Sequence, residues 1–132
     1  MGKFFDWETK YNLDIPHMDS GHQQIVDCMN LLHDLHEANA GHTKVDRAML
    51  DLVRVTTRHF AEEEALMEKI GFEDRRKHGL IHKSLLQRLQ TFHDEFERDR
   101  KLTEDFFVFL KMWLKSHICG IDVKYAAHAQ VA

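Results

Sequence analysis

Apolar residues recur at steps of three and four in four segments of the chain, about residues 19–40, 43–70, 73–98 and 103–119. This spacing gives an α-helix one apolar face and leaves the opposite face polar. Short connections between the segments favour antiparallel neighbours. The pattern therefore predicts an all-α fold, an up-down-up-down antiparallel four-helix bundle. Three helices with a disordered arm are the main alternative.

Several residues at the N-terminal ends of the predicted helices are of types that commonly cap a helix. Asp19 or Ser20 is expected to cap the first helix, and Thr43, with Asp46 three residues later, is expected to begin the second. Thr103 is expected to cap the fourth helix.

The remaining boundaries follow from glycines and from the residues outside the four segments. Gly71 is expected to end the second helix. Residues 1–18 are predicted to form an N-terminal arm, and residues 120–132 a C-terminal tail with a short helix. The whole of residues 1–132 is expected to fold as a single domain.

Composition excludes some classes of function. The net charge of −4 lacks the basic character of nucleic-acid-binding domains, so no nucleic-acid partner is expected. No apolar run approaches the roughly 18 residues of a membrane span. Cys28 and Cys119 do not make a disulfide framework and are interpreted as reduced thiols, so a cytoplasmic location is expected. Eleven histidines are the unusual feature.

Polar residues interrupt the apolar stripes of all four predicted helices. They are His22, His59, Glu63, His78, His82 and His117. In the predicted topology, the beginnings of the first and third helices lie at the same end of the bundle as the ends of the second and fourth. At a rise of 1.5 Å per residue, all six fall within roughly 5–15 Å of that end. The sequence therefore predicts that they meet in one layer of the core.

Such a layer would be costly without a bound metal. Burial of an unpartnered imidazole costs a few kcal/mol, and burial of a lone carboxylate costs more. Metal binding converts this cost into stabilisation. Imidazole and carboxylate donors without thiolate suit iron, manganese or zinc. Because a tetrahedral zinc ion would use only four ligands, two metal ions bridged by carboxylates fit the number of donors better.

Asp122 is the candidate for a second bridging carboxylate. It follows His117 by five residues, which is about 140° around an ideal helix. A straight helix cannot direct both side chains inward, so the backbone is expected to bulge or unwind between them. Gly120 lies in that interval and would permit the change.

These residues resemble the hemerythrin family, specifically its bacterial single-domain form. The shared pattern is His22, His59-x-x-x-Glu63, His78-x-x-x-His82 and His117-x-x-x-x-Asp122. The flanking residues agree as well: Trp7, Asp19-x-x-His22, His59-Phe60, Glu63-Glu64 with Met67, Trp113-Leu114-x-x-His117-Ile118 and Asp122-x-x-Tyr125. The resemblance covers nearly the whole chain.

The resemblance implies two non-haem iron ions with an oxo or hydroxo bridge and a protein that binds O2 reversibly, for storage or delivery, and is not an enzyme. It assigns His78, His82 and His117 to one iron, His22 and His59 to the other, and Glu63 and Asp122 to both. The iron with two histidines would keep an open position for O2, and the same position could take a small anion or NO. The implied O2 pocket is lined by Ile25, Phe60, Trp113, Leu114 and Ile118. An O2-, redox- or NO-sensing module, or a di-iron enzyme that reduces peroxide or NO, is the alternative. The oligomeric state is left open.

Other polar residues are expected not to be metal ligands. Glu62 and Glu64 flank Glu63 but are predicted to be solvated, and Tyr125 to be a packing residue whose hydroxyl could reach a ligand. Four histidines near the far end of the bundle are expected to be surface or satisfied core residues rather than a second metal site. They are His33, His36, His42 and His93.

Overall fold

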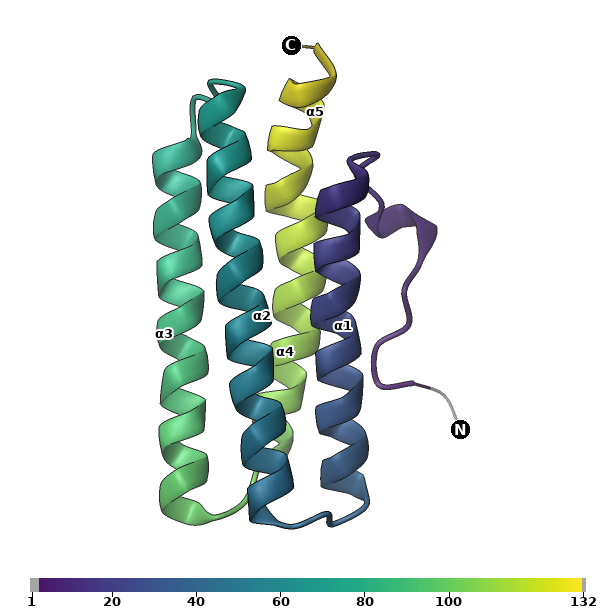
Figure 1. The fold of residues 1–132 in the computed structure, drawn as a ribbon, viewed down its shortest axis with the longest axis vertical. Helices are drawn as coiled ribbons and strands as arrows, with labels where there is room; N and C mark the ends of the chain where they lie inside the picture. The colour runs from purple at the N-terminus through teal and green to yellow at the C-terminus, as the bar shows by residue number, and fades with distance from the viewer. Residues whose placement is uncertain (1–2, 132) are drawn as a thin grey trace.

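Four long helices lie side by side and run alternately up and down in the computed structural model, which describes residues 3–131 (Figure 1). They are α1 (Pro16–Glu37), α2 (His42–Lys69), α3 (Arg75–Asp99) and α4 (Glu104–His117). Each helix buries its apolar stripe against the others, and the buried side chains form one continuous core. The predicted antiparallel four-helix bundle is confirmed.

The two ends of the chain extend this bundle. The N-terminal arm contains a short 3-10 turn, η1 (Thr9–Tyr11), and lies along the outer side of α1 (Figure 1). At the other end, α4 continues through a π-helical segment, η2 (Ile118–Asp122), into α5 (Val123–Val131). The short C-terminal helix is thus a continuation of the fourth helix rather than a separate element.

The first helix begins earlier than the predicted cap. Pro16 stands in its first turn, where the fixed φ of proline suits a helix and its missing N–H removes no hydrogen bond. Asp19 lies inside that turn, and its Oδ1 accepts a hydrogen bond from the backbone N–H of Leu13 at 2.7 Å. The prediction of Asp19 or Ser20 as the cap is therefore wrong. Asp19 fastens the N-terminal arm to α1 instead.

The second helix also begins without the predicted cap. Gly41 precedes it at φ +95°, and no side chain caps its first turn. The expected role of Thr43 and Asp46 is therefore wrong. Asp46 faces α3, where its Oδ1 lies 2.6 Å from Nε2 of His93. By contrast, the Thr103 hydroxyl accepts a hydrogen bond from the N–H of Phe106, so the predicted cap of the fourth helix is confirmed.

The turn between α2 and α3 depends on Gly71. Its φ of +67° lies in the left-handed region, and its N–H bonds to the carbonyl of Glu68 while the next N–H, of Phe72, bonds to that of Met67. These two bonds form a Schellman motif, which satisfies carbonyls at the helix end. Gly71 therefore ends the second helix as predicted.

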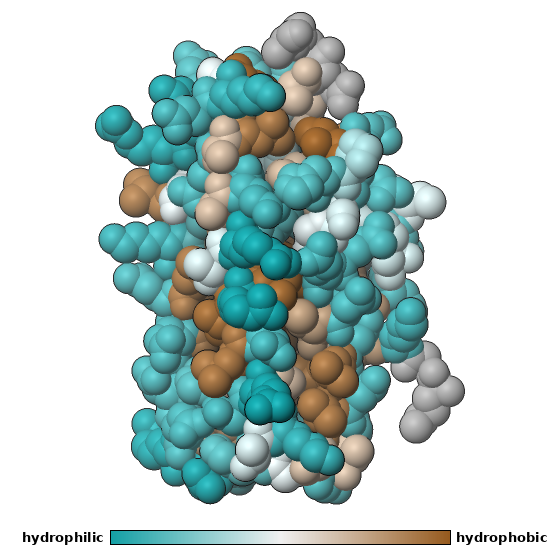
Figure 2. All heavy atoms as spheres, in the orientation of Figure 1, coloured by the Kyte–Doolittle hydropathy of each residue, from teal (hydrophilic) through white to brown (hydrophobic). Residues whose placement is uncertain are grey.

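The outer surface is mainly hydrophilic on the face drawn in Figure 2, with apolar side chains in small separate patches. Within residues 3–131, no helix combines the length and the apolar composition that a membrane span requires.

We predict opposite effects for alanine at Gly71 and at Gly120. A side chain at Gly71 would be strained by its positive φ, so Gly71→Ala should lower the free energy of unfolding by about 1 kcal/mol. A Cβ at Gly120 would meet no atom within 4 Å, and its φ is not positive, so Gly120→Ala should leave stability unchanged or slightly raised. Urea unfolding at matched metal content tests this pair. A large loss of stability in Gly120→Ala would show that the π-helical segment does require glycine.

Candidate metal centre

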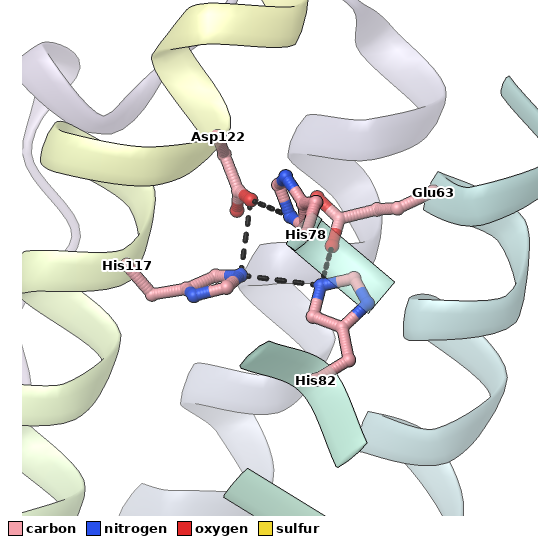
Figure 3. Close-up of side chains that lie close together, drawn as sticks. All are labelled: Glu63, His78, His82, His117 and Asp122. Atoms are coloured by element: carbon pink, nitrogen blue, oxygen red, sulfur yellow. Dashed lines mark hydrogen bonds and ion pairs between the residues drawn. The ribbon is translucent and has the colours of Figure 1, made fainter. Parts of the chain in front are cut away.

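All seven predicted ligands are buried, and each side chain is at most 3% exposed. They come from all four helices of the bundle and from η2, and they meet at one end of the molecule. The close-up in Figure 3 shows five of them pointing toward a common centre: Glu63, His78, His82, His117 and Asp122. The residues that were predicted to meet in one layer of the core therefore do so.

These five residues form the first donor group. Each offers one donor atom, and those atoms all lie within 4.8 Å of one another. Oδ1 of Asp122 is 3.0 Å from Nε2 of both His78 and His117, and Oε1 of Glu63 is 3.1 Å from Nε2 of His82. Donor atoms this close from separate elements make a compact cage of the kind that holds one cation.

His22, His59 and Glu63 form the second donor group. Oε2 of Glu63 lies 3.4 Å from Nε2 of each of these histidines. Glu63 therefore belongs to both groups, with one carboxylate oxygen directed to each. Asp122 also reaches across, because its Oδ2 is 2.9 Å from Nε2 of His22.

The π-helical segment η2 brings His117 and Asp122 to the same site. His117 ends α4, and Asp122 is the last residue of η2. Adding a residue to the turn rotates Asp122 inward, so that the two side chains converge despite their spacing of five. The bulge predicted between them is confirmed. Gly120 is not needed for it, since its φ is ordinary and a Cβ would have open space.

Several buried donor atoms in the site make no hydrogen bond. They are Nε2 of His59, Nε2 of His78, Oε1 of Glu63 and Oδ1 of Asp122. Each imidazole nitrogen lies near a carboxylate oxygen, and each carboxylate oxygen lies near an imidazole nitrogen. The atoms are nevertheless directed at a shared centre rather than at one another. Unsatisfied buried polar atoms are rare and costly. Their arrangement fits metal cations, which would accept all of these lone pairs at once.

The two carboxyl groups are ionised despite their burial. Burial raises the pKa of Glu63, but contacts with His22, His59 and His82 outweigh it and hold the pKa well below its usual range. For Asp122, burial and the charge of Glu63 are outweighed by contacts with His117, His22 and His78, which lower the pKa to about 2. Both side chains are thus anionic donors at neutral pH.

Two residues outside the predicted ligand set hold the ligands in place. Oε2 of Glu64 lies 3.2 Å from Nδ1 of His82, which leaves the Nε2 of that ring free to face the centre. The side chain of Glu64 is half exposed, in agreement with the prediction that it is solvated, but its contact with a ligand was not predicted. The hydroxyl of Tyr125, fully buried, donates to Oε2 of Glu63 at 2.5 Å.

Gly21 was missed by the sequence analysis, and it allows α1 to pack against the site. A Cβ at this position would lie 2.1 Å from Nδ1 of His59, far inside van der Waals contact. Only glycine leaves room for that ring. The signal in the sequence was a glycine within the first helix, next to His22, where helix propensity alone disfavours it.

The five residues of the predicted O2 pocket are all buried. Phe60 stacks on His82 with ring centroids 3.7 Å apart and planes 3° apart, and its ring also lies 5.8 Å from that of His117. Trp113 packs edge-on against Phe60. These rings place an apolar wall against His82 and His117.

Comparison with known proteins agrees with the geometry. Residues 13–129 match the family model described as "Hemerythrin HHE cation binding domain". The chain is 32% identical over 119 residues to bacteriohemerythrin of Pseudomonas paraeruginosa, covering 90% of this chain and 77% of that protein. It is 32% identical over 120 residues to myohemerythrin of Riftia pachyptila, covering 90% and 88%. A crystal structure of wild-type hemerythrin matches with a TM-score of 0.85 at 25% identity, over 93% of this chain and 95% of that one.

We predict that Gly21→Ala displaces His59 and lowers the metal content of the protein. The new methyl group would overlap the ring of His59, so that ring must move. Overpacking of this kind lowers the free energy of unfolding by about 1–3 kcal/mol. Metal analysis per chain and urea unfolding measure both effects. Gly120→Ala is the control, because a Cβ at that position would meet no atom within 4 Å and its φ is not positive. Wild-type metal content in Gly21→Ala would contradict the prediction.

The metal-free protein should lose stability as the pH rises from 6.5 to about 9. Burial lowers the pKa of His22, but contacts with Asp122 and Glu63 outweigh it and raise the pKa to about 9. The stabilising charge is fully present below pH 6.5, the usual pKa, and is lost as the pH passes the raised value. The free energy of unfolding should fall by up to about 3 kcal/mol.

Urea unfolding of the metal-free protein at pH 6 and pH 9 measures this loss. His22→Gln should unfold with much less difference between the two pH values, because the titrating group is gone. Equal stability of the wild-type protein at both would refute the assignment.

Proposed function

The chain belongs to the hemerythrin family, and on that premise we propose that it binds O2 reversibly at a non-haem di-iron centre. His78, His82 and His117 would hold one iron, and His22 and His59 the other. Glu63 and Asp122 would bridge the pair, together with an oxo or hydroxo group.

One observation carries the proposal: the donors fall into two groups that share their carboxylates. Glu63 directs one oxygen toward His82 and the other toward His22 and His59. Asp122 does the same, with Oδ1 near His78 and His117 and Oδ2 near His22. A single-cation site would have no use for carboxylates that face two ways. Two cations about one carboxylate's width apart would use both oxygens of each.

The two groups are unequal, which supports an open position for a ligand. The first supplies three histidines and the second two, so an ion held by His22 and His59 would have fewer protein ligands. When bound, the iron pair supplies two electrons to O2, and the protein's part is to hold the pair, exclude water and leave one position free. The same position would also accept small anions or NO.

The surrounding residues support reversible binding. Tyr125 donates to Glu63 and Glu64 accepts from His82, so a bridging carboxylate and a ligand ring are each held from behind. Buried Phe60 and Trp113 place apolar rings beside His82 and His117, and apolar surroundings disfavour the loss of charged reduced oxygen. These features support O2 storage or delivery as the role, rather than turnover of a substrate.

The proposal predicts about two irons per chain and a colour change that reverses. Reduced protein should be nearly colourless, should develop a charge-transfer band in the visible region on exposure to air, and should lose that band under vacuum. An optical O2 titration of the reduced protein, with iron analysis of the same sample, measures both. One zinc and no iron per chain would refute the di-iron centre. Direct conversion by O2 to the oxidised ferric form, with no reversible band, would refute reversible binding.

A further inference from the structure

A second cluster of histidines and carboxylates lies at the end of the bundle opposite the candidate metal centre. His42 and Asp46 are in the first turns of α2, and His93 and Glu97 are in the last turns of α3. Asp46 precedes His59 by 13 residues of continuous helix, which is roughly 20 Å at 1.5 Å per residue. We propose that these four residues form a separate site for a single Zn²⁺ ion.

The local geometry is that of a two-helix metal site. Each helix contributes a histidine and a carboxylate four residues later, and residues at that spacing share one face of a helix. The two pairs therefore face each other across the α2–α3 contact. The same device, with pairs four residues apart on these two helices, builds half of the candidate metal centre at the other end.

Several distances between the donor atoms are close to those between neighbouring ligands of a tetrahedrally coordinated ion. Oε1 of Glu97 lies 3.5 Å from Nε2 of His42 and 3.6 Å from Nε2 of His93. Neighbouring ligands of a tetrahedral zinc ion are roughly 3.3 Å apart, given bonds of about 2.0–2.1 Å. Donor atoms of His42, Asp46 and Glu97 already lie within 4.8 Å of one another, and the ring of His93, which is not in that group, would have to move for all four donors to meet. Nε2 of His93 and Oδ1 of Asp46, now 2.6 Å apart in a hydrogen bond, would have to separate by less than 1 Å.

The chemistry of the donors favours zinc. Two imidazoles and two carboxylates without thiolate suit a borderline cation, and four such ligands match the tetrahedral coordination that zinc usually adopts in proteins. Contact with His93 lowers the pKa of the Asp46 carboxyl, and this carboxylate lies beside two imidazoles. Zn²⁺ would balance the charges of the two carboxylates. At this partly exposed position, it could enter directly from solvent.

Two neighbours of His42 bear on the site. Its ring stacks on buried Phe96 of α3, with centroids 4.6 Å apart and planes 10° apart, which restrains the ring beside Glu97. Nη1 of Arg100 lies 3.2 Å from Nε2 of His42 and holds the lone pair that the ion would use. Arg100 is exposed and long, so it can move away when the ion binds. Its presence means that zinc must compete with a guanidinium at this atom.

The site would act as a clamp between the beginning of α2 and the end of α3. His42 and His93 were predicted to be surface or satisfied core residues, because nothing in the sequence shows that they lie next to each other in space. His33 and Glu37 are also four residues apart, at 3.6 Å, but within the described residues His33 belongs to no group of converging donors, and Glu37 faces His36 and Glu104 instead. That pair provides the matched control.

Titration of the iron-loaded protein with Zn²⁺ tests the proposal. Calorimetry should show one Zn²⁺ per chain with micromolar affinity or tighter, while the iron content stays unchanged. His42→Gln, Asp46→Asn and His93→Gln should each weaken binding at least tenfold, and His33→Gln should not. Unchanged iron loading and optical spectrum would show that each variant is folded. Co²⁺ in place of zinc should give the intense visible bands of a four-coordinate ion.

Three results would overturn the site. The first is the absence of zinc binding to the iron-loaded protein. The second is binding that keeps its wild-type affinity in all three variants. The third is zinc that enters only as iron leaves, which would place it in the candidate metal centre. The His42 cluster would then be only a hydrogen-bonded contact between α2 and α3. The iron content and O2 titration of the same sample report on the proposed function separately, so either proposal can fail alone.

Discussion

The structure depends on placing five imidazoles and two carboxylates in one buried layer. In a protein of marginal stability, that many buried polar groups are tolerable only if their donor atoms converge on cations or on one another. In the metal-free arrangement the charges offset one another in part, because His22 is held in its protonated form between Glu63 and Asp122. Several lone pairs are still unsatisfied, and those are the atoms that metal ions would use.

The bundle is organised to serve this layer. Antiparallel helices bring residues from the beginning of one element beside residues from the end of the next, so ligands far apart in sequence meet with little backbone distortion. The exception is η2, where a π-helical turn corrects the direction of Asp122. Close approach of α1 and α2 is the second requirement, and Gly21 supplies it. The π-helical turn and the close helix approach are therefore both found at the site.

Contacts from outside the ligand set define the orientation of the ligands. Glu64 accepts a hydrogen bond from one ligand ring even though it is half exposed, and Tyr125 reaches Glu63 from α5. The helix α5, which continues the chain past Asp122, places this hydroxyl against a carboxylate 62 residues away in sequence. Tyr125 therefore both packs in the core and orients the carboxylate of Glu63.

Much of the fold and of the candidate site could be predicted from the sequence, because periodicity is a local property. Apolar residues at steps of three and four determine the helices, and polar residues within those stripes, such as His59 and Glu63, must point into the core. The spacing of His117 and Asp122 was enough to require a bulge. What the sequence determined by itself was therefore the fold class, the composition of the buried polar layer and the position of its irregular turn.

Only the tertiary structure decided which side chains meet across helices. Gly21 is important because of the ring of His59 from another helix, Glu64 because of His82, and His42 because of Glu97. Helix beginnings were also decided by contacts outside the helix: Asp46 looks like a capping residue but is engaged by His93 of α3, and Asp19 is engaged by the backbone of Leu13 in the N-terminal arm. A residue's own neighbours in sequence carry no record of such contacts. They depend on how far one helix is rotated and shifted against the next, which is settled by the packing of the whole core.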